Sequence, residues 1–239
     1  MEAEPRQEDE LLDGRRLAVG APSNAGNASA ADASAAGSVR VFDYNATREA
    51  WERIGCDIDG NFEGSLFGWS VSLSADGSKL AVGAPGNASQ MGEARVYEFA
   101  SSGASCCGGA CWSQVANTMS AAVVGGGFAS SVSLSPDGGS IVAGAPGEGD
   151  ADGAAGVAIV YALHFGRHGR PDRWLQIGDD IDGSAAGDQF GASVSLALYG
   201  DVVAVGAPFY SSKAKKTNQG QVCAFMREDG SSCNDVHTF

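Results

Sequence analysis

Six acidic side chains in two short segments are the candidates for metal chemistry in this chain. Asp57, Asp59 and Glu63 lie in segment 56–64, and the second segment, 178–188, carries Asp180, Asp182 and Asp188. Oxygens at alternate positions resemble half of a calcium loop, because calcium takes about six to eight oxygen ligands. The corresponding segment 117–126 has no acidic residue. We therefore favour polar turns in which Asp side chains bond their own backbone, with calcium as the alternative.

The histidines have no arrangement typical of a catalytic centre. His164 and His168 fall in one predicted loop, and His237 is close to the C-terminus. The chain has neither a Gly-x-Ser-x-Gly motif nor a paired-histidine metal motif. We predict no catalytic residue, no cofactor-binding residue, no cofactor and no enzymatic activity.

The elements that must position these side chains recur at a fixed spacing. The motif Gly-Ala-Pro occurs four times at intervals of 61 to 63 residues, ending at Pro22, Pro85, Pro146 and Pro208. Tryptophan recurs in step at Trp51, Trp112 and Trp174, and phenylalanine at Phe67, Phe128 and Phe190. A constant spacing of this size predicts one structural unit copied along the chain.

Each unit contains alternating runs typical of half-buried strands, which we label A to D. Strand A follows the phenylalanine (69–74, 130–135, 192–197), strand B ends in Gly-Ala-Pro, strand C follows it, and strand D carries the tryptophan. Asp-Gly pairs in the turns 74–78 and 135–139 favour tight A–B hairpins. A four-stranded antiparallel sheet of this length is a propeller blade, which buries both faces by stacking on its neighbours. We expect the periodic tryptophans to pack between blades and Trp69, which breaks the period, to be exposed or axial.

The motifs resemble the FG-GAP repeat family, which includes the propeller of integrin α subunits and many algal and bacterial proteins. The resemblance rests on Phe67-Gly68 with Gly83-Ala84-Pro85, Phe128-Ala129 with Gly144-Ala145-Pro146, and Phe190-Gly191 with Gly206-Ala207-Pro208. The first copy keeps Gly20-Ala21-Pro22 without a Phe-Gly pair, and the Ser-Val-Ser-Leu-Ser strands are closest to the algal and bacterial branch. The resemblance implies an all-β propeller of four-stranded antiparallel blades, usually seven in the related proteins, and the four copies in this chain predict about four blades.

The A–B turns depart from the integrin pattern, in which a longer loop with several aspartates holds calcium. Here these turns offer at most one carboxylate each, such as Asp76 and Asp137. Since calcium requires several charged oxygens, we predict that these turns hold no calcium.

The domain organisation follows from the repeats. We predict an acidic N-terminal extension over 1–14 and a propeller over 15–239, with blades at approximately 15–56, 66–115, 127–178 and 189–239. The blades form either a compact four-bladed ring or an arc of a larger propeller, and we favour the arc. Open edge strands then predict self-association.

Composition limits the partners. The net charge of −14 argues against nucleic acid, and the basic cluster Lys213, Lys215 and Lys216 is interpreted as a solvated loop tip. No apolar run is long enough to span a membrane, so we predict no direct membrane insertion.

Cysteines and sequons indicate the compartment. Cys223 and Cys233 flank a predicted hairpin turn and are candidates for a disulfide. Cys56 is expected in a D–A loop and the cluster Cys106, Cys107 and Cys111 in a C–D loop, and these two kinds of loop lie at opposite ends of a blade, which argues against a bridge between them. The glycosylation candidates Asn27, Asn45 and Asn87 lie in predicted loops. Together these favour an extracellular, cell-surface or luminal location, although this chain carries no signal peptide.

The function predicted from these observations is recognition without catalysis. The D–A and B–C loops vary in sequence and share one face of the propeller, where we expect a protein or glycan partner. The alternatives are a structural subunit that uses open blade edges, and an enzyme-associated propeller with a site in the central channel.

Overall fold

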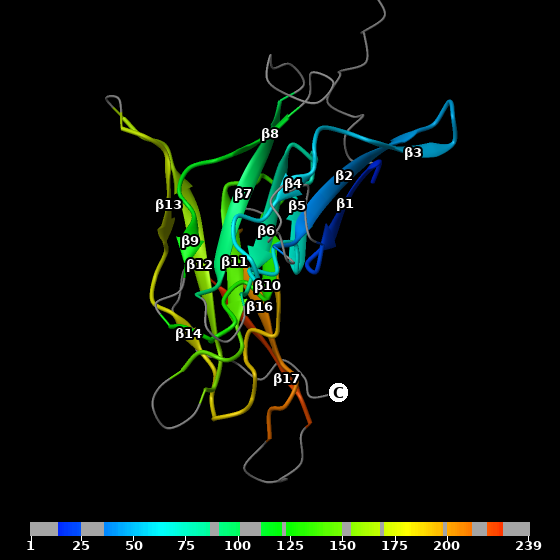
Figure 1. Cartoon of the computed structure of the whole chain (residues 1–239). Helices are drawn as coiled ribbons and strands as arrows, with labels where there is room; N and C mark the ends of the chain where they lie inside the picture. The colour runs from blue at the N-terminus through cyan, green and yellow to red at the C-terminus, as the bar shows by residue number, and fades with distance from the viewer. Residues whose placement is uncertain are drawn as a thin grey trace, which may run out of the picture.

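The computed structural model describes residues 14–24, 36–86, 91–100, 111–120, 123–149, 154–167, 170–197, 200–211 and 219–226. In these ranges the chain forms antiparallel β-sheets joined by turns, with no α-helix (Figure 1). The predicted all-β class is confirmed. The alternating small and β-branched residues explain it, because they suit a pleated sheet with both faces packed.

Four sheets follow one another along the chain, and we call them blades I to IV. Blade I contains β1 (Arg16–Ala21), β2 (Ser38–Asn45), β3 (Ala50–Arg53) and β4 (Ile58–Asp59). Blade II contains β5 (Ser70–Leu73), β6 (Lys79–Ala84), β7 (Glu93–Ala100), β8 (Cys111–Gln114) and β9 (Met119–Ser120). Blade III contains β10 (Ser131–Leu134), β11 (Ser140–Ala145), β12 (Val157–His164), β13 (Arg173–Gln176) and β14 (Ile181–Asp182). Blade IV contains β15 (Ser193–Leu196), β16 (Val202–Ala207) and β17 (Gln221–Met226).

The outer strand of each of the first three blades is split in two. The short strands β4, β9 and β14 pair with the same partners as β3, β8 and β13, namely β2, β7 and β12. Between the two halves the backbone passes through positive φ, at Gly55, Ala116 and Gly178. The chain therefore bulges and returns to the same partner, and these blades extend to Asp59, Ser120 and Asp182, a few residues beyond the predicted limits.

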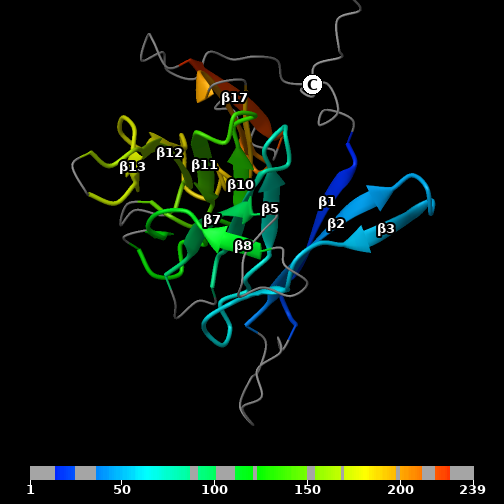
Figure 2. The same cartoon turned by 90° about the horizontal axis from the view of Figure 1, so that it is seen from above.

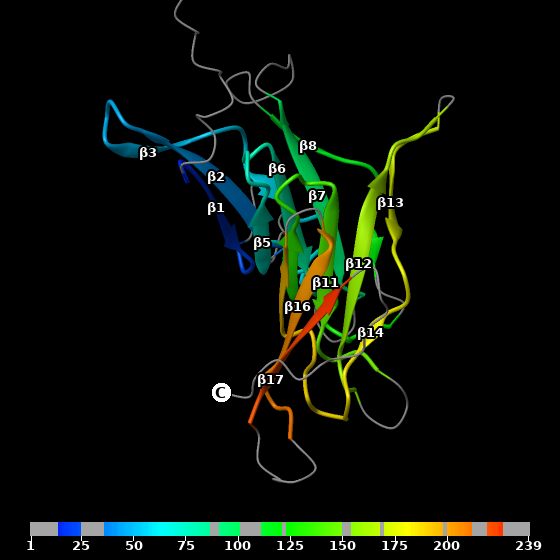
Figure 3. The same ribbon diagram turned by 180° about the vertical axis from the view of Figure 1, so that it is seen from behind.

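The blades form a propeller arc. The inner strands β5, β10 and β15 lie side by side, and β1 contacts β5 (Figure 2). Within the described ranges no strand pairing joins the sheet of β1 to the sheet of β17, and the two strands lie apart in Figures 2 and 3. The fold is therefore an arc of stacked blades.

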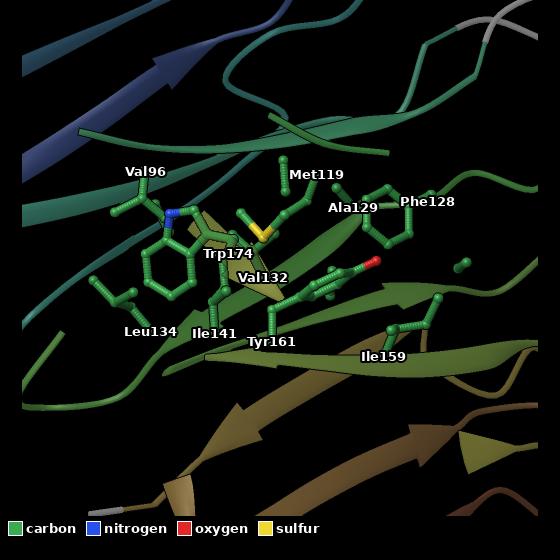
Figure 4. Close-up of a cluster of buried hydrophobic side chains, with 14 of the residues drawn as sticks. Val96, Met119, Phe128, Ala129, Val132, Leu134, Ile141, Ile159, Tyr161 and Trp174 are labelled. Atoms are coloured by element: carbon green, nitrogen blue, oxygen red, sulfur yellow. The ribbon is translucent and has the colours of Figure 1, made fainter. Parts of the chain in front are cut away.

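The core lies between the blades. The repeated phenylalanine is buried and meets an aromatic ring of strand C edge-on, as in the Phe128–Tyr161 pair with centroids 6.3 Å apart. Figure 4 shows this pair in the core between blades II and III, with Trp174 beside Val96. Interblade packing is confirmed for Trp174 and Trp112, whereas Trp51 is 46% exposed at the start of the arc, where no described blade covers it. The expectation that Trp69 is exposed is confirmed.

Serines of the inner strands bind each blade to the next. Ser70 Oγ donates a hydrogen bond to the carbonyl oxygen of Ala129 at 2.9 Å. The amide of Leu134 donates to Ser72 Oγ at 3.0 Å. Ser131 and Ser133 make the equivalent bonds to blade IV. These bonds satisfy backbone groups that the close stacking removes from water, so the Ser-Val-Ser-Leu pattern sets the blade spacing.

Candidate functional site

Large apolar side chains are exposed at the end of the blades that carries the D–A and B–C loops. Phe62 follows β4 and is 58% exposed, and Met91 precedes β7 and is 53% exposed. Both belong to the same end because consecutive strands of a blade run antiparallel. With Ser65, Ala84 and Glu93 they line a hollow of about 280 Å³.

The exposed apolar character continues along the arc. Val123 and Val124, between β9 and β10, and Phe209, after β16, are also exposed. We call the surface formed by Phe62, Met91, Val123, Val124 and Phe209 the loop face. Large exposed apolar side chains that share one end of a fold indicate an interaction site.

A buried arginine supports the hollow of the loop face. Arg95 on β7 is 5% exposed, and its Nη2 lies 2.7 Å from Glu93 Oε1. With the Asn61 amide turned so that its oxygen faces the guanidinium, both terminal nitrogens of Arg95 donate to it at 3.0 Å. The guanidinium also lies 5.7 Å from the ring centroid of Phe67. Arg95 thereby anchors the turn that carries Phe62, since Asn61 is the residue before it.

The first acidic segment lies beside this arginine. Asp57 and Asp59 line a second hollow of about 330 Å³ between blades I and II, together with Arg95 and Trp112. Asp57 Oδ1 is paired with Arg40 Nε at 3.0 Å and with Arg53 Nη1 at 3.2 Å. The charge of Asp57 is therefore neutralised within the protein.

The other calcium candidates are spread over several turns. Asp180 accepts a hydrogen bond from Gln176 at 2.8 Å, and Asp188 is buried before Phe190. Asp182 ends β14, and Glu63 lies in the turn before β5. In the described part of the chain no group of three or more His, Cys, Asp and Glu side chains is placed to hold a metal ion. Calcium binding at these residues stays the alternative to the predicted polar turns.

Two buried carboxyl groups are electrostatically perturbed. Burial and the nearby Asp180 carboxylate raise the pKa of Glu148, and burial raises the pKa of Asp188. Glu148 Oε2 and Asp188 Oδ2 have no hydrogen-bond partner among the described residues. Burial, with Asp180 and Glu148, also raises the pKa of Tyr161 to about 12. Glu148 and Asp188 lie in loops and Tyr161 lies on β12, whereas the inner strands that would line a channel are β5, β10 and β15.

The cysteines of the described ranges, Cys56, Cys111 and Cys223, are all disulfide-bonded. The predicted partner of Cys223, Cys233, lies outside these ranges, as do Cys106 and Cys107, so that pairing stays a prediction. The expected separation of Cys56 from the cluster is wrong for Cys111, because both line the second hollow. The bulge after β3 brings Cys56 to the start of β8, which a flat four-stranded blade does not anticipate.

Among the glycosylation candidates only Asn45 is described, since Asn27 and Asn87 lie outside the described ranges. Asn45 is the last residue of β2 and not a loop residue. Its Oδ1 accepts the amide of Thr47 at 3.0 Å, and its Nδ2 donates to Glu52 at 3.1 Å. Its amide nitrogen is therefore engaged in the β2–β3 turn. His164 ends β12, and His168, His237 and the three lysines of 213–216 lie outside the described ranges.

The sequence interpretation missed two groups of basic residues. Arg95 and the equivalent Arg40 stand where the later repeats have Ile159 and Cys223, and these charged residues within an apolar strand pattern were the available signal. Arg167, Arg170 and Arg173 gather around the β12–β13 hairpin, where their spacing of three in sequence was the signal.

No helix long and apolar enough to cross a membrane occurs among the residues that the structure describes.

Comparisons with known proteins give structural likeness only. No family model matches the sequence, and no curated protein matches it. The structure is similar to Sqt1 from Chaetomium thermophilum (14% identity, 71% of this chain and 36% of that chain, TM-score 0.41). It is also similar to the β-propeller domain of the Trilobed protease from Pyrococcus furiosus (11% identity, 93% of this chain and 68% of that chain, TM-score 0.37). A third similar structure is that of the leech intramolecular trans-sialidase (14% identity, 80% of this chain and 29% of that chain, TM-score 0.40). The chain thus spans about a third of the length of Sqt1 and of the trans-sialidase.

Proposed function

We propose that the chain is a non-enzymatic recognition module of the FG-GAP repeat type, which binds a protein or glycan partner through the loop face. The observation that carries the proposal is the pair Phe62 and Met91, both more than half exposed around a hollow of about 280 Å³. Side chains of this size contribute strongly to binding when a partner covers them, because burial removes their apolar surface from water.

The support beneath the pair adds to the argument. Arg95, Glu93 and Asn61 hold the Phe62 turn from inside, so Phe62 sits on a supported turn. A preorganised surface loses less entropy on binding than a mobile one. The disulfide-bonded cysteines support an extracellular, cell-surface or luminal location for this module.

The test compares the double variant Phe62→Ser/Met91→Ser with Met226→Ser. Met226 is 57% exposed at the end of β17, away from the loop face, and serves as the matched control. Peptides from a displayed random library and glycans on an array are selected against the wild-type protein. We expect the double variant to weaken binders of the loop face by about tenfold or more, and Met226→Ser to leave them unchanged. A set of selected binders in which none is weakened by the double variant, or a failure to select any, would contradict the proposal.

A second candidate function is that of a structural subunit, which associates through its open blade faces. Apolar side chains exposed at the two ends of the arc favour it. Leu17 and Val19 in blade I are 43% and 45% exposed, whereas the equivalent Leu80 and Val82 are fully buried. At the other end Val222 is 54% exposed where Ala158 of blade III is buried.

Sedimentation equilibrium over a range of concentrations tests this candidate. Self-association that Val19→Glu or Val222→Glu abolishes would support it, because a charge on a buried face is costly. A monomer at all concentrations would count against it.

A further inference from the structure

The β12–β13 hairpin gathers cationic and apolar side chains around one hollow. The hollow has a volume of about 850 Å³ and is lined by His164, Phe165, Arg167, Arg170, Arg173 and Leu175, among others. It lies at the C–D end of blade III, which the antiparallel strand order places opposite the loop face. Figures 1 and 3 show this hairpin at the upper end of blade III.

The three arginines of the hollow differ from five other arginines of the described ranges. Arg16, Arg40, Arg48, Arg53 and Arg95 each form an ion pair with a carboxylate. Arg167, Arg170 and Arg173 are exposed, and no ion pair joins them to any acidic group in the described ranges.

The one acidic side chain of the hairpin does not compensate these charges. Asp172 Oδ1 accepts the amide hydrogen of Gly166 at 2.8 Å and so closes the hairpin turn. In a chain of net charge −14, three neighbouring guanidinium groups therefore remain available to an anionic partner. Guanidinium groups bind carboxylates in a two-pronged geometry that gives both strength and direction.

Apolar side chains in the same hollow narrow the class of partner. Phe165 is 73% exposed and Leu175 is 45% exposed, between and beside the arginines. A sulfated or carboxylated glycan offers anions but no apolar side chains. A peptide segment that combines acidic with aliphatic residues can occupy both kinds of surface.

We propose that the hollow formed by Phe165, Arg167, Arg170, Arg173 and Leu175 is a docking site for an acidic peptide segment that also carries aliphatic side chains. The acidic groups pair with the three arginines, and an aliphatic side chain covers Phe165. This site is separate from the loop face, so the protein has two recognition surfaces at opposite ends of its blades.

The test measures fluorescence anisotropy of a labelled peptide, Glu-Glu-Leu-Glu-Glu-Leu-Glu-Glu, titrated with the full chain. Two matched peptides replace every Glu by Gln or every Leu by Ser. We expect the first peptide to bind best, and its affinity to fall as salt is raised because exposed ion pairs are screened.

Variants of the full chain assign the site. We expect Arg167→Gln/Arg170→Gln/Arg173→Gln to weaken the peptide by about tenfold or more. Arg40→Gln/Arg48→Gln/Arg53→Gln changes the net charge equally and should leave affinity unchanged. Phe165→Ser should weaken the leucine peptide but not the serine peptide, and it keeps the test decisive if the triple variant does not fold.

Four outcomes with the protein variants and the matched peptides would overturn the proposal. They are undiminished binding to the hairpin triple variant, equal loss in the control triple variant, equal affinity for the Gln peptide, and equal affinity for the Ser peptide. Tighter binding of a heparin oligosaccharide than of the leucine peptide would also overturn it, in favour of a simple polyanion site.

Discussion

Ser131 Oγ donates a hydrogen bond to the carbonyl oxygen of Gly191 at 2.8 Å, and this bond joins the inner strand of blade III to the Phe-Gly corner of blade IV. Ser70 makes the same bond to Ala129 one blade earlier. Ser193, the equivalent residue of blade IV, has no such bond in the described ranges and is exposed. The repeat thus supplies its own matched control at the end of the arc.

Replacing Ser131 by Ala should lower the free energy of unfolding by about 1–2 kcal/mol, because the buried carbonyl of Gly191 loses a partner. Ser193→Ala should change it by less than about 0.5 kcal/mol, as is usual for exposed positions. Urea unfolding followed by circular dichroism measures both. Equal effects of the two substitutions would show that the bond does not contribute to blade stacking.

Gly144→Ala should destabilise the protein by about 3 kcal/mol, since overpacking against backbone is costly. A Cβ at this position would overlap both the carbonyl oxygen of Gly191 and Ser131 Oγ. Gly206→Ala meets only the equivalent Ser193 Oγ, which can rotate away, and should cost less than about 1 kcal/mol. The difference between their unfolding free energies isolates the contact with the neighbouring blade, and a negligible difference would contradict the close approach.

Glu148→Gln should increase stability at neutral pH. The folded-state pKa of Glu148 is raised by burial and by Asp180, so its ionised form destabilises the folded state. For a carboxyl group whose pKa is higher in the folded state, the loss of folding stability begins as pH rises above the pKa of the unfolded chain. At lower pH the group is protonated in both the folded and the unfolded state, and no stability is lost. The advantage of the variant should therefore grow as pH rises above about 4, the ordinary glutamate value, and level off above the raised pKa of Glu148, as measured by urea unfolding. Exposed Glu98→Gln serves as the control, and a constant advantage at every pH would contradict the assignment.

Calcium at about 1 mM should leave the melting temperature unchanged, because the A–B turn carboxylates are already used within their turns. Asp137 Oδ1 accepts from Ser135 Oγ at 2.6 Å and from the amide of Gly139 at 3.0 Å, and Asp76 makes the equivalent bonds. Scanning calorimetry with Asp76→Asn/Asp137→Asn in parallel checks this. A calcium-dependent rise in melting temperature that the double variant removes would show a site in these turns.

The strands were predictable because their signals are local. Period-two alternation and Asp-Gly turns place the inner three strands of each repeat, and the fixed spacing predicts stacked blades. The short strands β4, β9 and β14 were not predictable, since strands of two residues carry no periodic signal and form only because β2, β7 and β12 offer an unpaired edge. The same bulge brings Cys56 and Cys111 to one hollow, although their predicted loops were expected at opposite ends of a blade.

The sequence by itself determined the repeated unit, its all-β character and the residues that pack between blades, because these depend on side-chain alternation and on recurring small residues. Only the tertiary structure decided which side chains remain exposed and which charges remain unpaired. Arg95 and Arg167 are the same residue type in the sequence, but one is buried against Glu93 and Phe67 and the other lies open beside Phe165. That difference arises from the stacking of neighbouring blades, which covers one position and leaves the other in water.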